Sequence, residues 1–174
     1  MKIAIVTMSD RASAGIYDDR SGKEIEKYLS ENIKNSYEII YKLIPDDYTK
    51  IVETLNELIE MSCSLILTTG GTGPAPRDVT PEATKEVLDK ELPGFGELMR
   101  MHSLKYVPTS ILARGTAGVA KNSFILNLPG SPKAIRENLE AVFPAIPYAI
   151  DLINGDYIDS EIAFRPNKKA TIKA

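Results

Sequence analysis

The residues best suited to chemistry begin with a glycine-rich segment, Gly70-Gly71-Thr72-Gly73, directly after the apolar run Leu65–Thr69. Glycine tolerates positive φ and lets backbone N–H groups approach an anion without a Cβ clash, and Thr72 adds a hydroxyl donor. The segment matches neither the P-loop nor the dinucleotide fingerprint, and Pro74 prevents a helix from starting at once. Taken alone, it indicates either a phosphate-binding loop or a flexible turn.

Two acidic positions follow the ends of strand-like runs near this segment. Asp78 lies just beyond the glycines and before a helix start, and Asp46 follows the run that ends at Ile44. A carboxylate beside a phosphate loop is what a magnesium site needs, although Asp78 could simply favour the helix dipole. Asp47 is suited to cap the next helix, which would leave Asp46 free. Arg77 could contact phosphate or pair with Asp78.

A third segment, Pro129-Gly130-Ser131, joins a strand-like run to a helix that starts at Pro132. A turn followed by a helix N-terminus can bind an anion, although Ser131 could instead be occupied as the N-cap. His102, the only histidine, lies in a helical run and is expected to be structural. The sequence therefore speaks against a serine–histidine hydrolase and against a histidine-ligated zinc site.

Short apolar runs alternate with amphipathic segments along the whole chain, and this alternation predicts the elements that hold those loops. Strands are expected in the runs Ile3–Thr7, Tyr37–Ile44, Leu65–Thr69 and Thr116–Leu128, the last with a turn at Asn122-Ser123. Helices are expected from Ser21, after Asp47, from Thr80, over Phe95–Ser103, from Ser131 and over Pro147–Asn154.

Three helix boundaries carry specific expectations. Ser21 and Glu24 have the spacing of a capping box, with Ser21 as the N-cap. Thr80 is expected to cap a helix whose first position is Pro81. Pro93-Gly94 is expected to break the chain before the helix that starts at Phe95.

Continuous apolar strands alternating with helices predict an α/β fold with three layers, in which a mostly parallel sheet carries helices on both faces. In such folds ligands bind beyond the carboxyl ends of the strands. The three segments described above each follow such an end, so we expect them to share one edge of the sheet.

The chain has 174 residues, which predicts one domain over 1–174, with a frayed polar tail from about 165. A net charge of −3 speaks against a nucleic-acid partner. Cys63 is the only cysteine, so no internal disulfide can form. The N-terminal apolar run is too short for a signal peptide and no segment is long enough to span a membrane, so we expect a cytoplasmic protein without a membrane partner.

Six segments of this sequence, in this order, are similar to those of one family. They are Ser9-Asp10-Arg11-Ala12-Ser13, Leu43-Ile44-Pro45-Asp46, Thr68-Thr69-Gly70-Gly71-Thr72-Gly73-Pro74, Arg77-Asp78-Val79-Thr80-Pro81, Pro93-Gly94-Phe95-Gly96-Glu97 and Leu126-Asn127-Leu128-Pro129-Gly130. From about Lys2 to Pro166 the chain closely resembles the molybdopterin adenylyltransferase family, which is similar to the G domain of gephyrin. Each segment alone is a weak indication of this family, but the six together are specific for it.

The resemblance implies a reaction that joins AMP from ATP to the terminal phosphate of molybdopterin and releases pyrophosphate. It places the two functional acids on Asp46 and Asp78, which we interpret as Mg²⁺-positioning residues rather than proton acceptors. It implies nucleotide phosphates near Gly70 to Gly73, near Thr80 and near the turn Pro129-Gly130-Ser131, and the pterin towards Ser9, Asp10 and Asp46.

The resemblance also implies a homotrimer, with an enzyme that inserts molybdenum as a further partner. Two other functions stay open at the sequence level. One is a module of the same fold that binds or delivers molybdopterin without adenylylating it. The other is a generic flavodoxin-like nucleotide-binding domain, which would leave most of the matched segments unexplained.

Overall fold

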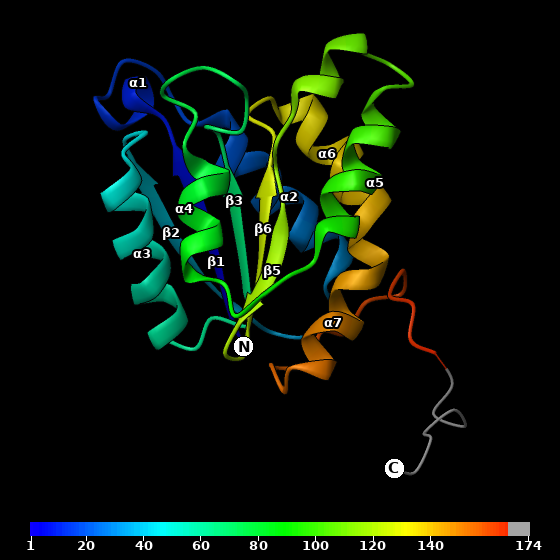
Figure 1. Cartoon of the computed structure of the whole chain (residues 1–174). Coiled ribbons are helices and arrows are strands. Elements are labelled where there is room, and N and C mark those ends of the chain that lie inside the picture. Colours follow the sequence, from blue (N-terminus) through cyan, green and yellow to red (C-terminus); the bar gives the residue numbers. More distant parts are fainter. Residues whose placement is uncertain (167–174) are drawn as a thin grey trace.

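A computed structural model of the chain describes residues 1–166 and shows one six-stranded sheet between two layers of helices (Figure 1). The strands are β1 (Lys2–Met8), β2 (Glu38–Ile44), β3 (Leu65–Thr69), β4 (Lys90–Glu91), β5 (Ala117–Ala120) and β6 (Ser123–Leu128). Their order is β2-β1-β3-β6-β5-β4; the first four are parallel, and β5 runs antiparallel to both its neighbours. The predicted three-layer, mostly parallel architecture is confirmed.

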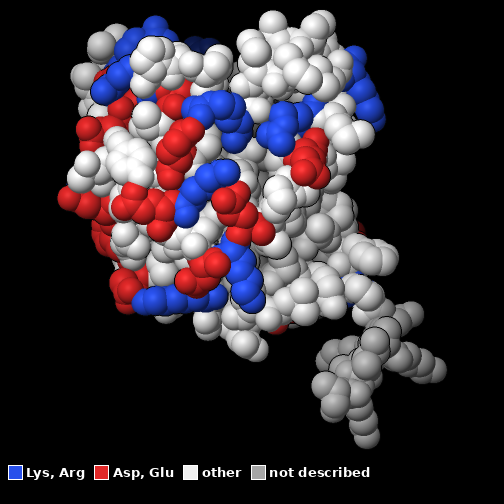
Figure 2. All heavy atoms as spheres, viewed as in Figure 1, with Lys and Arg blue, Asp and Glu red and all other residues white. Residues whose placement is uncertain are grey.

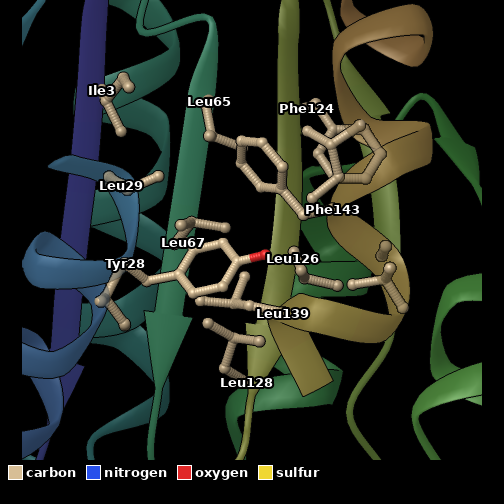
Figure 3. Close-up of a cluster of buried hydrophobic side chains, with 14 of the residues drawn as sticks. Ile3, Tyr28, Leu29, Leu65, Leu67, Phe124, Leu126, Leu128, Leu139 and Phe143 are labelled. Carbon is tan, nitrogen blue, oxygen red and sulfur yellow. The ribbon is translucent and has the colours of Figure 1, made fainter. Parts of the chain in front are cut away.

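Helices cover both faces of the sheet. They are α1 (Asp10–Ser13), α2 (Arg20–Asn32), α3 (Tyr48–Glu60), α4 (Thr80–Val87), α5 (Pro93–Ser103), α6 (Pro132–Val142) and α7 (Ile146–Leu152), with short 3₁₀ helices η1 (Pro108–Leu112) and η2 (Phe143–Ala145). Side chains of α2, α5, α6 and α7 form one core with β1, β3 and β6 (Figure 3). Side chains of α3 and α4 form the second core on the opposite face. Because the central strands are buried on both faces, their apolar runs are continuous.

Local contacts correct the predicted helix starts. Helix α2 begins at Arg20 and its N-cap is Asp19, whose carboxylate accepts the N–H groups of Ser21 and Gly22 at 2.9 and 3.1 Å. The capping box headed by Ser21 is therefore wrong, because a carboxylate two residues earlier already satisfies these donors.

Two more helix starts differ from the expectation. Thr80 is the first residue of α4 rather than its cap, and its hydroxyl donates to the carbonyl of Gly70 at 2.9 Å. Pro93 and Gly94 belong to α5 instead of preceding it. Proline is tolerated there because the first turn of a helix leaves its N–H groups unpaired.

Two further expectations concern the C-terminal tail and membrane spans. The frayed tail falls mainly on residues 167–174, outside those described, whereas Arg165 pairs with Asp151. Among residues 1–166, no helix has the length and hydrophobicity that crossing a bilayer requires.

Candidate active site at the carboxyl edge of the sheet

Four parallel strands end almost level with one another. Met8 of β1 pairs with Ile44 of β2, Thr7 of β1 pairs with Thr69 of β3, and Thr69 pairs with Leu128 of β6. The loops that follow these strands therefore start along one edge of the sheet, where Figure 1 shows α1 and the loop before α4 together. All the candidate residues lie in these loops except Thr80 and Asp10, which are the first residues of α4 and α1.

The glycine segment is a tight turn that only glycine fits. Gly70 and Gly71 have φ of 99° and 60°, in the region that L side chains rarely adopt. A Cβ on Gly70 would lie 2.2 Å from the carbonyl oxygen of Met8, and one on Gly71 would lie 2.4 Å from the Thr80 hydroxyl. Thr80 also donates its backbone N–H to Gly71 at 3.1 Å. The turn thus lies close against β1 on one side and is hydrogen-bonded to α4 on the other.

The carboxylate of Asp46 lies beside Gly71. Its Oδ1 atom is 3.2 Å from the position that a Cβ on Gly71 would take, and its Oδ2 atom accepts the N–H of Asp10 at 3.0 Å. Burial raises the pKa of Asp46, and the negative charges of Asp10 and Asp78 add to this rise. A group held this way gains from a nearby cation, which would favour its charged form.

The carboxylate of Asp78 lies beside Gly73, two residues further along the same turn. Its Oδ2 atom accepts the N–H of Ala75 at 2.9 Å and lies 2.7 Å from where a Cβ on Gly73 would be. The glycine turn is therefore flanked by two half-buried carboxylates, one from the loop after β2 and one from its own continuation.

This donor set suits Mg²⁺ bound with a phosphate ligand. Within residues 1–166, no three His, Cys, Asp or Glu side chains cluster closely enough to enclose a metal ion. Mg²⁺ commonly takes only one or two protein carboxylates and completes its octahedron with water and substrate phosphate oxygens. Asp46 and Asp78, on either side of a turn in which Thr72 carries the only side chain, match that requirement.

The loop after β1 contacts the loops that carry both of these acids. Asp10 accepts the N–H of Asp46 at 3.0 Å, and Arg77 donates to both carboxylate oxygens of Asp10 at 2.8 Å. The hydrogen bond from Arg77 lowers the pKa of Asp10. Of the two alternatives that the sequence left open for Arg77, pairing with Asp78 does not occur, because Asp10 reaches the guanidinium from the neighbouring strand end. Ser9 caps α1 and its hydroxyl lies 3.0 Å from that of Tyr17.

The turn after β6 abuts the glycine turn. The Thr69 hydroxyl donates to the carbonyl of Pro129 at 2.7 Å, and the Ser21 hydroxyl donates to the carbonyl of Gly130 at 2.7 Å. Ser131 is occupied as the N-cap of α6, where it accepts the N–H of Ala134 at 3.2 Å. Because this bond uses only an acceptor lone pair, an anion could still meet the Ser131 O–H as well as the backbone N–H groups of the turn.

Two hollows flank the turn after β6. One, of about 70 Å³, lies between the glycine turn and α5 and is lined by Thr72, Ser103, Asn127, Pro129 and Asn138, among others. The other, of about 550 Å³, is more open and lies between the turn and the loop before α2. The open hollow has room for a ligand beside the turn, whereas the smaller one has room only for a few water molecules.

Two residues that the sequence did not single out belong to this edge. Arg114 contacts the glycine loop from the segment before β5, and Asp19 accepts hydrogen bonds from Thr7 at 2.7 Å and Tyr41 at 2.6 Å. Only the position of Asp19 just before a helical run could have indicated its cap. Nothing in the spacing around Arg114 points to the site.

Comparison with known proteins agrees with this geometry. Residues 4–148 match the family described as "Probable molybdopterin binding domain". The chain belongs to this family. It is 56% identical over 171 residues to the molybdopterin adenylyltransferase of Helicobacter pylori strain J99, and the alignment covers 95% of this chain and 97% of that protein.

More distant family members share the same domain. Gephyrin of Dictyostelium discoideum is 44% identical over 160 residues, which cover 87% of this chain but only 22% of gephyrin. The solved structure of the molybdopterin biosynthesis enzyme MoaB from Thermus thermophilus superposes with a TM-score of 0.82 at 44% identity, covering 91% of this chain and 99% of that one. The resemblance drawn from the six sequence segments is confirmed.

Proposed function

We propose that this protein adenylylates molybdopterin with ATP in molybdenum cofactor biosynthesis. The observation that carries the proposal is the pair of half-buried carboxylates, Asp46 and Asp78, on either side of a glycine turn at the edge where four strands end. The relatives named molybdopterin adenylyltransferase, which match nearly the whole chain, support it.

In this reaction a terminal phosphate oxygen of molybdopterin attacks the α-phosphorus of ATP and forms a new P–O bond. The bond between the α-phosphorus and the oxygen that bridges it to the β-phosphate breaks, and pyrophosphate leaves with that oxygen. The second pKa of a phosphate monoester is about 6, so the nucleophile is mostly ionised at neutral pH. It needs no general base, which agrees with a site edge built from carboxylates and backbone amides.

What this chain must supply is placement and relief of repulsion between two polyanions. The N–H groups of the glycine turn and of the turn after β6 would hold phosphate oxygens, with Thr72 and Thr80 beside them. Asp46 and Asp78 would hold Mg²⁺, which neutralises phosphate charge when bound. The loop that carries Ser9 and Asp10 would face the pterin.

A direct assay tests the proposal. The protein is mixed with molybdopterin, MgCl₂ and ATP labelled at the α-phosphate, and the products are separated by chromatography. We expect label in adenylyl-molybdopterin together with one pyrophosphate per product. Tight binding of molybdopterin without label transfer would instead make the protein a binding or delivery module.

The domain range and the assembly are also proposals. We infer that residues 1–174 act as one catalytic domain in the cytoplasm, as a homotrimer that passes its product to an enzyme that inserts molybdenum. Exposed apolar side chains on α5, η1 and the turn between them support an interface with another chain; they are Leu98, Met101, Leu104, Tyr106, Val107, Ile111 and Leu112. Figure 2 shows a broad uncharged area in this part of the molecule.

A further inference from the structure

Arg114 is the residue that ties together both ends of the loop bearing Asp78. It lies between η1 and β5, in a segment that no part of the proposed mechanism uses. Its own N–H donates to the carbonyl of Thr72 at 2.9 Å, and its Nε donates to the carbonyl of Gly73 at 2.8 Å. One terminal nitrogen donates to the carbonyl of Asp78 and the other pairs with Glu82 in the first turn of α4.

Besides Arg114, the side chain that attaches the loop from Gly73 to Asp78 to the rest of the site is the exposed Arg77, which pairs with Asp10. Pro74 and Pro76 have no N–H to donate, and residues 74–77 are exposed. Two hydrogen bonds inside the loop join Ala75 and Asp78: the N–H of Ala75 to the Asp78 carboxylate and the N–H of Asp78 to the Ala75 carbonyl, both 2.9 Å. These bonds fix the loop's internal shape, but they do not fasten it to the rest of the site.

The Arg114 guanidinium differs from that of Arg77 because it holds the backbone at both ends of the loop, the carbonyls of Gly73 and Asp78. Its planar fork presents several N–H donors in fixed directions, and here it reaches the carbonyls at the two ends of the loop and a carboxylate at once. Both carbonyls belong to residues on which the geometry of the site depends, since the Asp78 carboxylate rests against Gly73. A shift of either end would move that carboxylate relative to Asp46.

We propose that Arg114 is a positioning residue that fixes the Asp78 carboxylate against the glycine turn by holding the backbone of Gly73 and Asp78. The inference rests on the proposed function, because it assigns Arg114 a role through Asp78 in the same site. Arg114 itself need not touch either substrate.

Replacement by lysine, Arg114→Lys, keeps the charge but removes the fork. We expect kcat to fall by about 100-fold, the scale associated with misplacing a reacting group by about 1 Å, while KM for molybdopterin changes less than about twofold. The amides of Ala75 and Asp78 should exchange hydrogen faster than in the parent. Arg114→Gln, neutral and shorter, repeats the test should the lysine variant fold poorly.

A matched control is Arg136→Lys. Arg136 has a similar exposed fraction, 32% against 36% for Arg114, and it also binds two groups, Glu24 and Glu31, but it lies between α2 and α6 away from the site. Arg136→Lys should leave both kcat and the exchange of the Ala75 and Asp78 amides unchanged.

A double-mutant cycle on Mg-ATP affinity decides whether Arg114 acts through Asp78. Titration calorimetry is carried out on the parent, Arg114→Lys, Asp78→Asn and the double variant. We expect the double variant to bind Mg-ATP about as weakly as Asp78→Asn alone. If the fold losses in Mg-ATP affinity of the two single variants multiply in the double variant, the proposal is overturned. Unchanged amide exchange in Arg114→Lys would overturn it as well.

The two proposals fail in different ways. A parent protein that binds molybdopterin but transfers no adenylyl group overturns the proposed function. Amide exchange then still shows whether Arg114 holds the loop that carries Asp78, and the affinity cycle shows whether that matters for the nucleotide.

Discussion

At the scale of single residues, the neighbours Asp46 and Asp47 divide two tasks. The Asp47 carboxylate accepts the N–H of Lys50 at 2.9 Å and caps α3, whereas the Asp46 carboxylate lies against the glycine turn and Asp10. Two adjacent residues of the same type therefore have different surroundings, which gives a matched pair of variants.

We predict that Asp46→Asn lowers adenylyl transfer at least about 100-fold, because a neutral amide cannot hold Mg²⁺ against phosphate as a carboxylate does. Asp47→Asn should turn over like the parent, since asparagine caps a helix about as well as aspartate. Initial rates at saturating substrates, with circular dichroism to verify folding, provide the test. Equal rates in the two variants would remove Asp46 from the proposed metal site.

A second prediction at this scale concerns Gly71→Val. The new side chain would meet the Thr80 hydroxyl and force an L residue to φ of 60°, so we expect a loss of stability of about 1–2 kcal/mol from the backbone alone. We also expect ATP to bind much more weakly, with molybdopterin less affected, because the turn would no longer admit a phosphate. Melting curves and calorimetric titration of each ligand measure the two effects.

Gly15→Val separates strain from phosphate binding. Gly15 also has positive φ, of 74°, but nothing lies within 4 Å of the position of its missing Cβ. This variant should lose stability by strain alone and bind ATP like the parent. Normal ATP binding by Gly71→Val would show that the turn is not the phosphate cradle.

At the scale of elements, two glycines of α5 have opposite surroundings. A Cβ on Gly94 meets nothing within 4 Å, whereas one on Gly96 would lie 2.4 Å from the carbonyl oxygen of Gly115. The close approach of α5 to the segment before β5 therefore depends on Gly96 alone.

We predict that Gly94→Ala raises the free energy of unfolding by about 0.5–1 kcal/mol, because alanine restricts the unfolded chain and favours helix. Gly96→Ala should lower it by about 1–3 kcal/mol, the usual cost of overpacking. Urea denaturation of both variants measures the difference, and the reverse order of stability would contradict this packing of α5.

The start of α2 gives a prediction that depends on pH. Burial opposes ionisation of Asp19, but hydrogen bonds from Thr7, Tyr41 and two backbone N–H groups outweigh it and lower its pKa. Burial and the Asp19 hydrogen bond also raise the pKa of Tyr41 to about 12, so Tyr41 remains a donor. Asp19→Ala should cost about 1–2 kcal/mol at pH 7.

Because the pKa of Asp19 is lower in the folded protein than the unfolded value of about 3.9, the stability from its charge is complete above that pH and is lost as the pH falls further. The difference in melting temperature between parent and Asp19→Ala should therefore stay constant from pH 7 to about pH 4 and narrow below that pH. Asp19→Asn, which keeps a capping oxygen, serves as the uncharged control. A difference that stays constant below about pH 4 as well would exclude the carboxylate as its source.

At the scale of the whole molecule, α5 and η1 carry an area of apolar side chains that is exposed to solvent. Two of its side chains, Met101 and Ile111, are 68% and 64% exposed, and contiguous exposed apolar areas usually mark interfaces. The charged side chains in view lie mainly over the other part of the molecule (Figure 2).

We predict that light scattering gives a mass of three chains of 19.1 kDa each. Met101→Asp and Ile111→Asp should lower that mass, because burying an unpaired carboxylate in an interface is unfavourable. Tyr157→Asp, at an exposed residue near the C-terminus of the described chain, is a control for surface charge. A single mass near one chain for the parent would contradict the trimer.

The sequence by itself determined the elements and the residue types at their ends. Apolar runs and helical spacing identify the central strands because both faces of those strands are buried. The glycines in the sequence predicted the turn after β3, because glycine readily adopts the positive φ that this turn has, whatever residues lie around it. Asp46 and Asp78 were candidates because one follows a strand end and the other follows the glycine turn, and the family resemblance then gave both of them a role.

Only the tertiary structure decided which loops meet. The order β2-β1-β3 places the loop after β1 between the other two, so Asp10 contacts both Asp46 and Arg77, a pairing that sequence distance gives no reason to expect. Arg114 reaches the glycine loop because β5 returns antiparallel beside β6 and brings the segment before it to the same edge. Strand order results from packing between residues far apart in the chain, and the local spacing of residues does not determine it.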